Sequence, residues 1–351
     1  MKKTVALIFG GEGFEHKISE ISAANLYSLI DSSLYGILPV GISRDGYWYI
    51  YEGQKDKINS GDWIFDKKNL IPTYPVKIDG GSGFIASGRI IPVICAIPCL
   101  HGNFGEDGII QGALTSAGIA YIGQSVCASS VTNDKIYSKL IAEHLGIPTA
   151  KWSYTPSASG EEARAAAEAR LTYPMFIKPA SLGSSYGASP VFSADGFESA
   201  YCEARRFDSK ILVEELIPFE YEVECAMLED GRLRFSPGGR ILSSGKFYDY
   251  RSKYSEDISP KTEAFSGKDA ETEEKISEYS AMLSEFIGLK HLSRIDFFIT
   301  KDKGIYFNEI NTFPGMTPTS LYPRLTEDMG IKDTSFINLL IKRAIQDDRR
   351  V

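Results

Sequence analysis

Residues 294–320 read RIDFFITKDKGIYFNEINTFPGMTPTS. Two runs of β-prone residues flank a polar KDKG cluster, so the pattern predicts two strands joined by a turn. If this turn sets the register, Asp296 lies opposite Glu309 and Arg294 lies opposite Asn311. Side chains alternate along a strand, so these four residues share one face, with Cβ atoms about 5 Å apart across the strands. The other face would carry a core side broken by one asparagine: Ile295, Phe297, Ile299, Tyr306, Asn308 and Ile310.

The polar face of this hairpin predicts a metal site. Asp296, Glu309 and Asn311 offer hard oxygen ligands, which suit Mg²⁺. Arg294 beside them would suit a transferring phosphoryl group or an oxyanion. The alternative is a solvated hairpin in which Arg294 pairs with Glu309. The following loop, 312–320, favours the site, because its turn-rich sequence exposes backbone N–H groups and hydroxyls, as an anion pocket does.

Composition is that of an ordinary globular protein. The 351 residues suffice for two or three domains, and 43% of them are hydrophobic. The net charge of −8 disfavours nucleic acid and anionic membranes as main partners, which leaves a small-molecule substrate. The longest apolar run, 90–100, contains two prolines, so we expect a cytoplasmic protein without a membrane segment. Five scattered cysteines without a C-x-x-C pair predict neither disulfides nor a zinc site.

The N-terminal part of the chain predicts an α/β unit. A short apolar strand at 4–9 runs into a glycine cluster and then into a helical pattern at 15–30. The glycines are weak evidence for a dinucleotide site, because the full G-x-G-x-x-G pattern is absent. A later strand, 93–98, ends in the glycine-rich turn HGNFGEDG, at the edge where α/β sheets bind ligands. His101 in this turn is a candidate binding residue, with a hydrogen-bonded loop histidine as the alternative.

The middle of the chain predicts a nucleotide site. Lys135 lies in the first turn of a helix that residues 132–134 can cap, and Lys178 lies on an apolar strand. The loop SLGSSYG, 181–187, could cover phosphates with its backbone N–H groups. The chain contains no GxxxxGK[ST] motif, so a nucleotide would not be held by a Walker loop.

Carboxylates recur along the next two expected strands. They are Glu214, Glu215, Glu220, Glu222 and Glu224. Such residues suit the amino and ribose hydroxyl groups of a nucleoside, with an exposed sheet edge as the alternative. A polar and aromatic loop follows at 243–266, and loops this long inside compact domains are often active-site lids.

A series of motifs resembles the D-alanine–D-alanine ligase family of ATP-grasp enzymes. In chain order they are FGG, HGNFGEDGIIQG, NDK, FIKPASLGSSYGAS, VEE, FYDYRSKY, SRIDFF and NEINTFPGMTPTSLYP. The resemblance implies an α/β ATP-grasp fold in three domains: an N-terminal substrate-binding domain (1–124), a central ATP-grasp subdomain (125–216) and a C-terminal ATP-grasp domain with the metal site and lid (217–351). The chain length resembles that of the long ligases, which include the vancomycin-resistance types.

The resemblance also implies roles for residues of this chain. The nucleotide set would be Lys135, Lys178 and Ser185 for the phosphates, Glu214, Glu215 and Ile217 for the adenine end, and Glu222 for the ribose. The metal set would be Asp296, Glu309 and Asn311, holding two Mg²⁺ ions that Mn²⁺ can replace. The reaction set would be Arg294 for the acyl phosphate and tetrahedral intermediate, His101, Gly315 and Ser320 for the substrates, and Ser184, Lys253 and Tyr254 for the lid. The implied protein is a homodimer that uses ATP to join D-amino acids for peptidoglycan precursors.

One departure from the family pattern concerns the first substrate. Where the family has a glutamate in Glu-Val-Ser, this chain reads Lys17-Ile18-Ser19, and a two-residue offset turns Glu15 roughly 200° away on a helix. Lys17 is the candidate residue at the first subsite, and the alternative is that Lys17 points to solvent and Glu15 or water takes its place. In the second-substrate loop, PTS at 318–320 replaces Ser-His-Ser. Three functions stay open: a D-alanine–D-alanine ligase, a D-alanine–D-serine or other D-amino acid ligase, and a weakly active nucleotide-binding relative.

Overall fold

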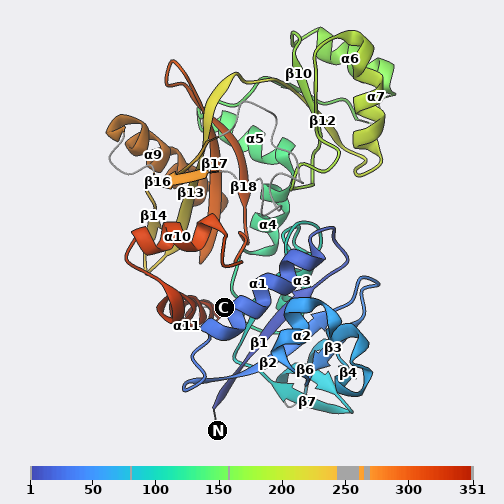
Figure 1. The fold of residues 1–351 in the computed structure, drawn as a ribbon, viewed down its shortest axis with the longest axis vertical. Coiled ribbons are helices and arrows are strands. Elements are labelled where there is room, and N and C mark those ends of the chain that lie inside the picture. The colour runs from blue at the N-terminus through green and yellow to red at the C-terminus, as the bar shows by residue number, and fades with distance from the viewer. Residues whose placement is uncertain (1, 80, 157–158, 243–260, 265–268, 349–351) are drawn as a thin grey trace.

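The computed structural model describes residues 2–79, 81–156, 159–242, 261–264 and 269–348. The expected lid residues Lys253 and Tyr254 lie outside these ranges. Figure 1 shows three groups of strands and helices along the long axis, with the N-terminal sheet at one end and strands β10 and β12 at the other. Among the described helices, none is long and apolar enough to cross a membrane.

The first sheet has five strands in the order β4-β3-β2-β1-β8. Strand β1 pairs in parallel with β2 and β8, and its continuous apolar run fits a strand covered on both faces. Val5, Leu7 and Phe9 of β1 enter one core, whereas Ala6 and Ile8 enter another. The elements are β1 (Lys3–Gly10), α1 (His16–Leu29), β2 (Tyr35–Ile42), β3 (Trp48–Tyr51), α2 (Lys55–Ser60), η1 (Asp62–Phe65), η2 (Lys67–Asn69), β4 (Leu70–Pro72), β8 (Cys95–Pro98) and α3 (Ile109–Ser116). A small antiparallel sheet adds β5 (Pro75–Ile78), β6 (Gly81–Ala86) and β7 (Arg89–Pro92).

The second sheet is antiparallel, with the order β11-β10-β12-β9. Glu214 on β12 lies opposite Phe176 on β10, so Lys178, two residues further along β10, is its diagonal neighbour. Helix α6 begins with a capping box between Ser159 and Glu162. The elements are β9 (Trp152–Ser153), α6 (Gly160–Glu168), β10 (Met175–Pro179), β11 (Ser189–Val191), α7 (Ala194–Arg205) and β12 (Ile211–Glu215).

The third sheet runs β16-β15-β13-β17-β18, with β14 paired to β13. Helix α9 covers its core side and ends at Gly288, whose φ of 75° is readily adopted by glycine. The elements are β13 (Phe219–Glu229), β14 (Leu233–Phe235), β15 (Gly239–Leu242), β16 (Lys261–Ala264), α9 (Ala270–Ile287), β17 (Leu292–Thr300), β18 (Ile305–Asn311), α10 (Leu321–Asp328) and α11 (Asp333–Asp348).

Two helices from the predicted central domain pack on this third sheet. They are α4 (Val126–Asn133) and α5 (Lys135–His144), and both contact β18. Ala128 and Ala142 lie in the same hydrophobic core as Phe297 and Phe307. The domain boundaries at 124/125 and 216/217 stay predictions.

The predicted hairpin register is confirmed at its polar end. Asp296 pairs with Glu309, and Arg294 pairs with Asn311. Beyond Asp296 the register shifts at a β-bulge, so Phe297 pairs with Phe307. The bulge reverses the alternation, because one extra residue on β18 turns the following side chains to the other face.

The expected facing of Tyr306 and Asn308 is therefore wrong. Phe307 is the residue that enters the core, where its exposed fraction is 1%. Tyr306 pairs with Phe298 and is only partly buried, and Asn308 lines the cavity described below.

Candidate active site

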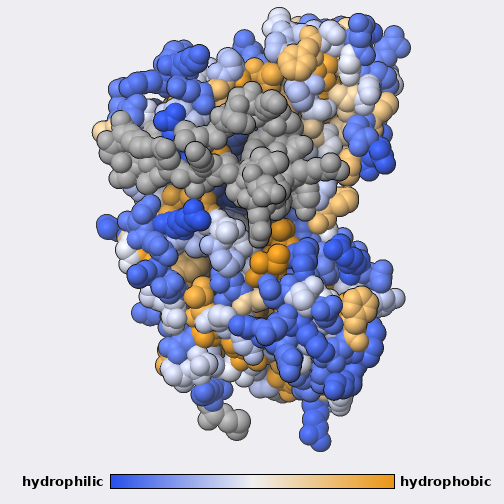
Figure 2. All heavy atoms as spheres, viewed as in Figure 1, coloured by the Kyte–Doolittle hydropathy of each residue, from blue (hydrophilic) through white to orange (hydrophobic). Residues whose placement is uncertain are grey.

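A cavity of about 460 Å³ lies where the first, second and third sheets meet. Nearly all the described residues of the predicted site line it: His101, Lys135, Lys178, Ser184, Ser185, Glu214, Glu215, Ile217, Glu222, Arg294, Asp296, Glu309, Asn311, Gly315 and Ser320. Lys17 does not line it. On the face drawn in Figure 2, hydrophilic residues predominate over the N-terminal part of the molecule, with hydrophobic residues in scattered patches.

The hairpin contributes a row of acceptor groups to this cavity. Asp296 receives two hydrogen bonds from Arg294, from Nε at 2.8 Å and from Nη2 at 2.7 Å. Asn311 donates to the same carboxylate at 3.0 Å, and Glu309 forms an ion pair with Lys135 at 3.2 Å. This carboxylate row, Asp296, Glu309 and Asn311, thus presents two carboxylates and a neutral amide. Arg294 and Lys135 offset the negative charge of the two carboxylates. This donor set fits a divalent cation such as Mg²⁺, since the ion could replace those contacts.

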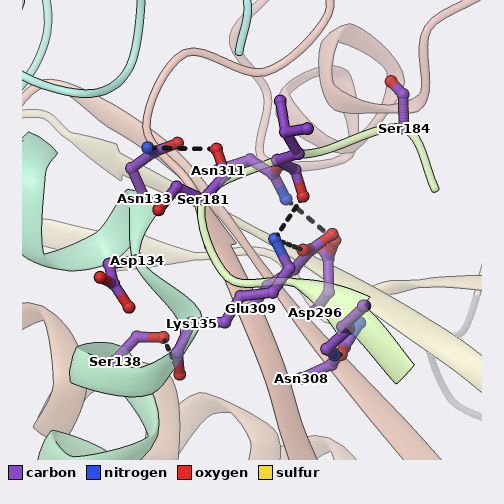
Figure 3. Close-up of polar contacts among 12 residues, drawn as sticks. Asn133, Asp134, Lys135, Ser138, Ser181, Ser184, Asp296, Asn308, Glu309 and Asn311 are labelled. Carbon is purple, nitrogen blue, oxygen red and sulfur yellow. Dashed lines mark hydrogen bonds and ion pairs between the residues drawn. The ribbon is translucent and has the colours of Figure 1, made fainter. Parts of the chain in front are cut away.

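Lys135 connects the carboxylate row to the serine-rich loop, residues 181–187. Its Nζ donates to the carbonyl of Leu182 at 2.7 Å, besides its contact with Glu309 (Figure 3). The helix that carries it begins at Lys135 because Asp134 caps α5 by accepting the N–H of Ile136. Lys135 is therefore held between the serine-rich loop and the carboxylate row.

Lys178, Glu214 and Lys139 form a buried charge cluster, and Lys139 was not among the residues predicted from the sequence. Glu214 binds Lys178 at 2.7 Å and Lys139 at 2.6 Å. Burial raises the pKa of Glu214, but the two lysines outweigh burial and hold this pKa below its ordinary value. Burial lowers the pKa of Lys178, and Glu214 offsets only part of that change. Nothing in the sequence around Lys139 indicates this contact, which depends on the approach of α5 to β12.

Glu15, rather than Lys17, lines the cavity. The Ser184 hydroxyl donates to Glu15 Oε1 at 2.6 Å. Lys17 instead donates to the carbonyl of Asn59 at 2.8 Å and pairs with Glu20, and 46% of its side chain is exposed. The expectation that Lys17 occupies the first subsite is wrong, whereas the alternative, in which Lys17 points away and Glu15 takes its place, agrees with the structure. Helix α1 begins at His16, so Glu15 is its cap residue and faces the cavity while Lys17 points to α2.

The loop after the hairpin is held by side chains from α1 and from the turn that follows β8. The Phe313 carbonyl accepts from His101 Nδ1 at 3.0 Å, and the Phe313 N–H donates to Glu106 at 2.8 Å. A carbonyl can only accept, so His101 Nδ1 carries a proton, and His101 Nε2 lies 3.2 Å from the Ser22 hydroxyl. Asn25 Nδ2 donates to the carbonyl of Met316 at 2.9 Å. His101 thus acts on the loop backbone, a role closer to the alternative considered from sequence.

Burial sets the ionisation of the two buried groups in this contact. It raises the pKa of Glu106 to about 7, against the effect of hydrogen bonds from the Phe313 and Gly102 N–H groups. It also lowers the pKa of His101, which keeps the imidazole neutral. Glu106 was inside the quoted HGNFGEDG motif but was not singled out.

Gly315 and Ser320 lie together at the other end of this loop. Ser320 Oγ accepts the Thr317 N–H at 3.0 Å and contacts the Thr317 hydroxyl at 2.7 Å. A Cβ at Gly315 would come within 3.0 Å of Ser320 Oγ, so glycine allows this close approach. Arg324, one helical turn after Ser320 on α10, also lines the cavity.

Comparisons with known proteins agree with this arrangement. Residues 4–124 match the family described as "D-ala D-ala ligase N-terminus", and residues 141–342 match "D-ala D-ala ligase C-terminus". A D-alanine–D-alanine ligase of Acetivibrio thermocellus is 37% identical over 98% of this chain and 96% of its own, and one of Ruminiclostridium cellulolyticum is 38% identical over 99% and 98%.

Solved structures agree as well. The VanG D-Ala:D-Ser ligase from Enterococcus faecalis has a TM-score of 0.89 at 35% identity, covering 98% of this chain and 100% of that one. The D-alanine–D-alanine ligase from Coxiella burnetii has a TM-score of 0.87 at 28% identity, covering 99% and 95%. The expected ATP-grasp fold with an N-terminal α/β part is thereby confirmed. This chain belongs to the D-alanine–D-alanine ligase family.

Proposed function

We propose that the protein is an ATP-dependent ligase that joins two D-alanine molecules into a dipeptide for peptidoglycan precursors. The observation that carries this proposal is one cavity in which a lysine cluster, a carboxylate row and a backbone-rich loop meet. Its relatives bear the name of this activity. The Glu15–Ser184 contact removes the reason to expect a weak relative, because an acidic residue does face the cavity.

The nucleotide would lie between the second and third sheets. Lys135 and Lys178 are both buried in the cavity wall, Lys135 against Glu309 and Lys178 against Glu214 and Asn308, so they could neutralise phosphate oxygens. Glu214 would accept the adenine amino group, since its pairing with two lysines keeps it ionised. Ile217, Glu215 and Glu222 also line the cavity. The first two would lie beside the adenine, and Glu222 on β13 would bind the ribose. Ser185, at a φ of 58° in the serine-rich loop, would bring its backbone close to the phosphates.

Asp296, Glu309 and Asn311 would hold Mg²⁺. The ion would offset phosphate charge during transfer of the phosphoryl group. We propose two ions, replaceable by Mn²⁺, because the row offers two carboxylates and an amide on neighbouring strands.

The amino acids would lie between the N-terminal sheet and the 312–320 loop. Glu15 would bind the ammonium of the first, whose carboxylate is phosphorylated by ATP. The amine of the second then attacks this acyl phosphate, forming the peptide bond as phosphate leaves. Arg294 would stabilise the negative charge on the attacked carbon's oxygen, together with the Gly315 backbone N–H. Ser320 would receive the carboxylate of the second amino acid.

A second candidate is ligation of D-alanine to D-serine. It is favoured by the similarity to the VanG D-Ala:D-Ser ligase and by polar groups at the second-substrate end, Thr319 and Arg324. These groups could receive a hydroxyl that D-alanine lacks.

The test is a product assay. Purified protein is incubated with ATP, Mg²⁺ and D-alanine, with D-serine, or with both, and phosphate release and product mass are measured. A D-alanyl-D-alanine product with D-alanine alone supports the first candidate, and a mixed product formed in preference supports the second. Phosphate release that no amino acid stimulates would contradict both.

We also propose that the protein works as a homodimer in the cytoplasm, where ATP is available. Sedimentation of the purified protein tests the assembly. A single species with the mass of one 38.7 kDa chain at working concentration would contradict the dimer.

A further inference from the structure

Glu224 extends the carboxylate row across a third strand. On β13 it pairs with Asp296 of β17, which pairs in turn with Glu309 of β18. Its side chain lines the cavity and is only 12% exposed. In the sequence, Glu224 is one of several alternating carboxylates, and nothing there assigns it a role. The register therefore adds an acidic residue beside the proposed metal ligands.

Arg294 lies between two of these carboxylates. Its Nε is 2.8 Å from Asp296 Oδ1 and 3.2 Å from Glu224 Oε2, and its Nη2 is 2.7 Å from Asp296 Oδ2. A guanidinium stays protonated in proteins, so Arg294 brings a permanent positive charge to both carboxylates. The guanidinium is thus a fixed cation whose orientation depends on both partners.

Asp296 has two competing uses. In the described structure both of its oxygens accept hydrogen bonds from Arg294. A divalent cation bound to Asp296 needs the same oxygens, and it repels the guanidinium as a like charge. Arg294 must then give up part of its contact with Asp296, and it needs another partner to stay oriented in a cavity where an unpaired charge is costly.

We propose that Glu224 is a positioning residue that keeps Arg294 in place when a divalent cation takes Asp296. Glu224 holds the Nε edge of the guanidinium, and the terminal N–H groups turn to the transferring phosphoryl group. Arg294 thereby exchanges its contact with Asp296 for a contact with the phosphoryl group without leaving the cavity. The inference rests on the proposed function for the identity of the substrate, but the exchange at Asp296 concerns only the metal.

The experiment measures Mg²⁺ affinity at a fixed, saturating ADP concentration by titration calorimetry, in five proteins. They are the wild type, Glu224→Gln, Arg294→Ala and the double variant, with Glu220→Gln as matched control. Glu220 lies on the same strand but is exposed and outside the cavity.

Glu224→Gln should weaken Mg²⁺ binding on the order of 10-fold, because Arg294 then holds Asp296 more tightly. In the Arg294→Ala background the same substitution should leave Mg²⁺ affinity within about 2-fold, since no competitor remains. Glu220→Gln should match the wild type.

Three outcomes would overturn the proposal. Equal weakening by Glu224→Gln in both backgrounds would make Glu224 a direct metal ligand. No change in either background would leave Glu224 without influence on the site. If Glu224→Gln does not fold, judged by its melting curve, Glu224→Asp replaces it, and wild-type Mg²⁺ affinity in that shortened variant would contradict a role that depends on reach.

A kinetic measurement separates this proposal from the proposed function. In Glu224→Gln we expect kcat for dipeptide formation to fall by about 10-fold or more while KM for ATP stays within about 2-fold. An equal change in both parameters would contradict a positioning role. If the wild type forms no dipeptide, the proposed function fails, and the Mg²⁺ titrations still decide the exchange at Asp296.

Discussion

Replacement of Glu214 by glutamine should destabilise the protein through the two lysines that it neutralises. Lys139 and Lys178 lie 2.6 and 2.7 Å from its carboxylate, and the Lys139 side chain is 1% exposed. The cluster carries a net charge of +1 in the wild type, from two lysines and one carboxylate, and +2 after the substitution. Loss of one partner from a buried ion pair costs about 3–5 kcal/mol, so we expect a loss in this range.

The assay is urea unfolding without ligand, followed by tryptophan fluorescence. The decisive comparison is Glu214→Gln/Lys139→Met, which returns the cluster to +1. We expect it to recover at least half of the lost stability, because the remaining lysine no longer faces a second buried cation. A cost below about 1 kcal/mol for Glu214→Gln, or a further loss in the double variant, would refute the reasoning.

Three further predictions concern the cavity. Asp296→Asn should reduce ATP turnover by at least about 100-fold in a folded protein, because it removes charge from the carboxylate row, as phosphate release at saturating Mg²⁺ will show. Glu15→Gln should raise KM for the first D-alanine by about 10-fold, while Lys17→Ala, at an exposed site outside the cavity, should change it by less than about 2-fold. Glu106→Gln should remove a pH dependence of stability, measured by urea unfolding between pH 4.5 and 8. Burial raises the Glu106 pKa from 4.5 to about 7, so the folded state binds the proton more tightly than the unfolded state. The stability of the wild type relative to this variant should therefore fall by up to about 3 kcal/mol as the pH rises from 4.5 to above 7.

Each of these predictions has an outcome that contradicts it. Wild-type phosphate release by Asp296→Asn would argue against metal binding by the carboxylate row. A larger effect from Lys17→Ala than from Glu15→Gln would reverse the assignment of the first subsite. Parallel pH profiles for the wild type and Glu106→Gln would show that the Glu106 carboxyl is not held in a buried environment.

The hairpin illustrates what local sequence can predict. Turn length and alternation were enough to pair Asp296 with Glu309, since both are local properties of two adjacent strands. The bulge was not predicted, because one extra residue leaves the composition of the strand unchanged. Asn308, the polar residue that broke the apolar face, was the available signal.

Residues that act through contacts between sheets were harder to predict. Lys139 and Glu106 have their roles because β12 and the 312–316 loop come close to them, and nothing near them in sequence indicates this. The motif letters favoured Lys17 over Glu15, because an alignment by letters ignores where the helix begins. The start of α1 at His16 places Glu15 outside the regular helix, where the rotation per residue no longer applies.

The core beneath β1 has a consequence for how the chain folds. Val5, Leu7 and Phe9 of β1 share that core with Phe336, Leu340 and Ile341 of α11. The strand ends at Gly10 and the helix begins at Asp333, so these residues can meet only after the long stretch of chain between them has been synthesised. Until then the nascent N-terminal sheet exposes apolar surface that α11 will later cover, and we expect it to depend on chaperones or to aggregate when synthesis is interrupted before that helix.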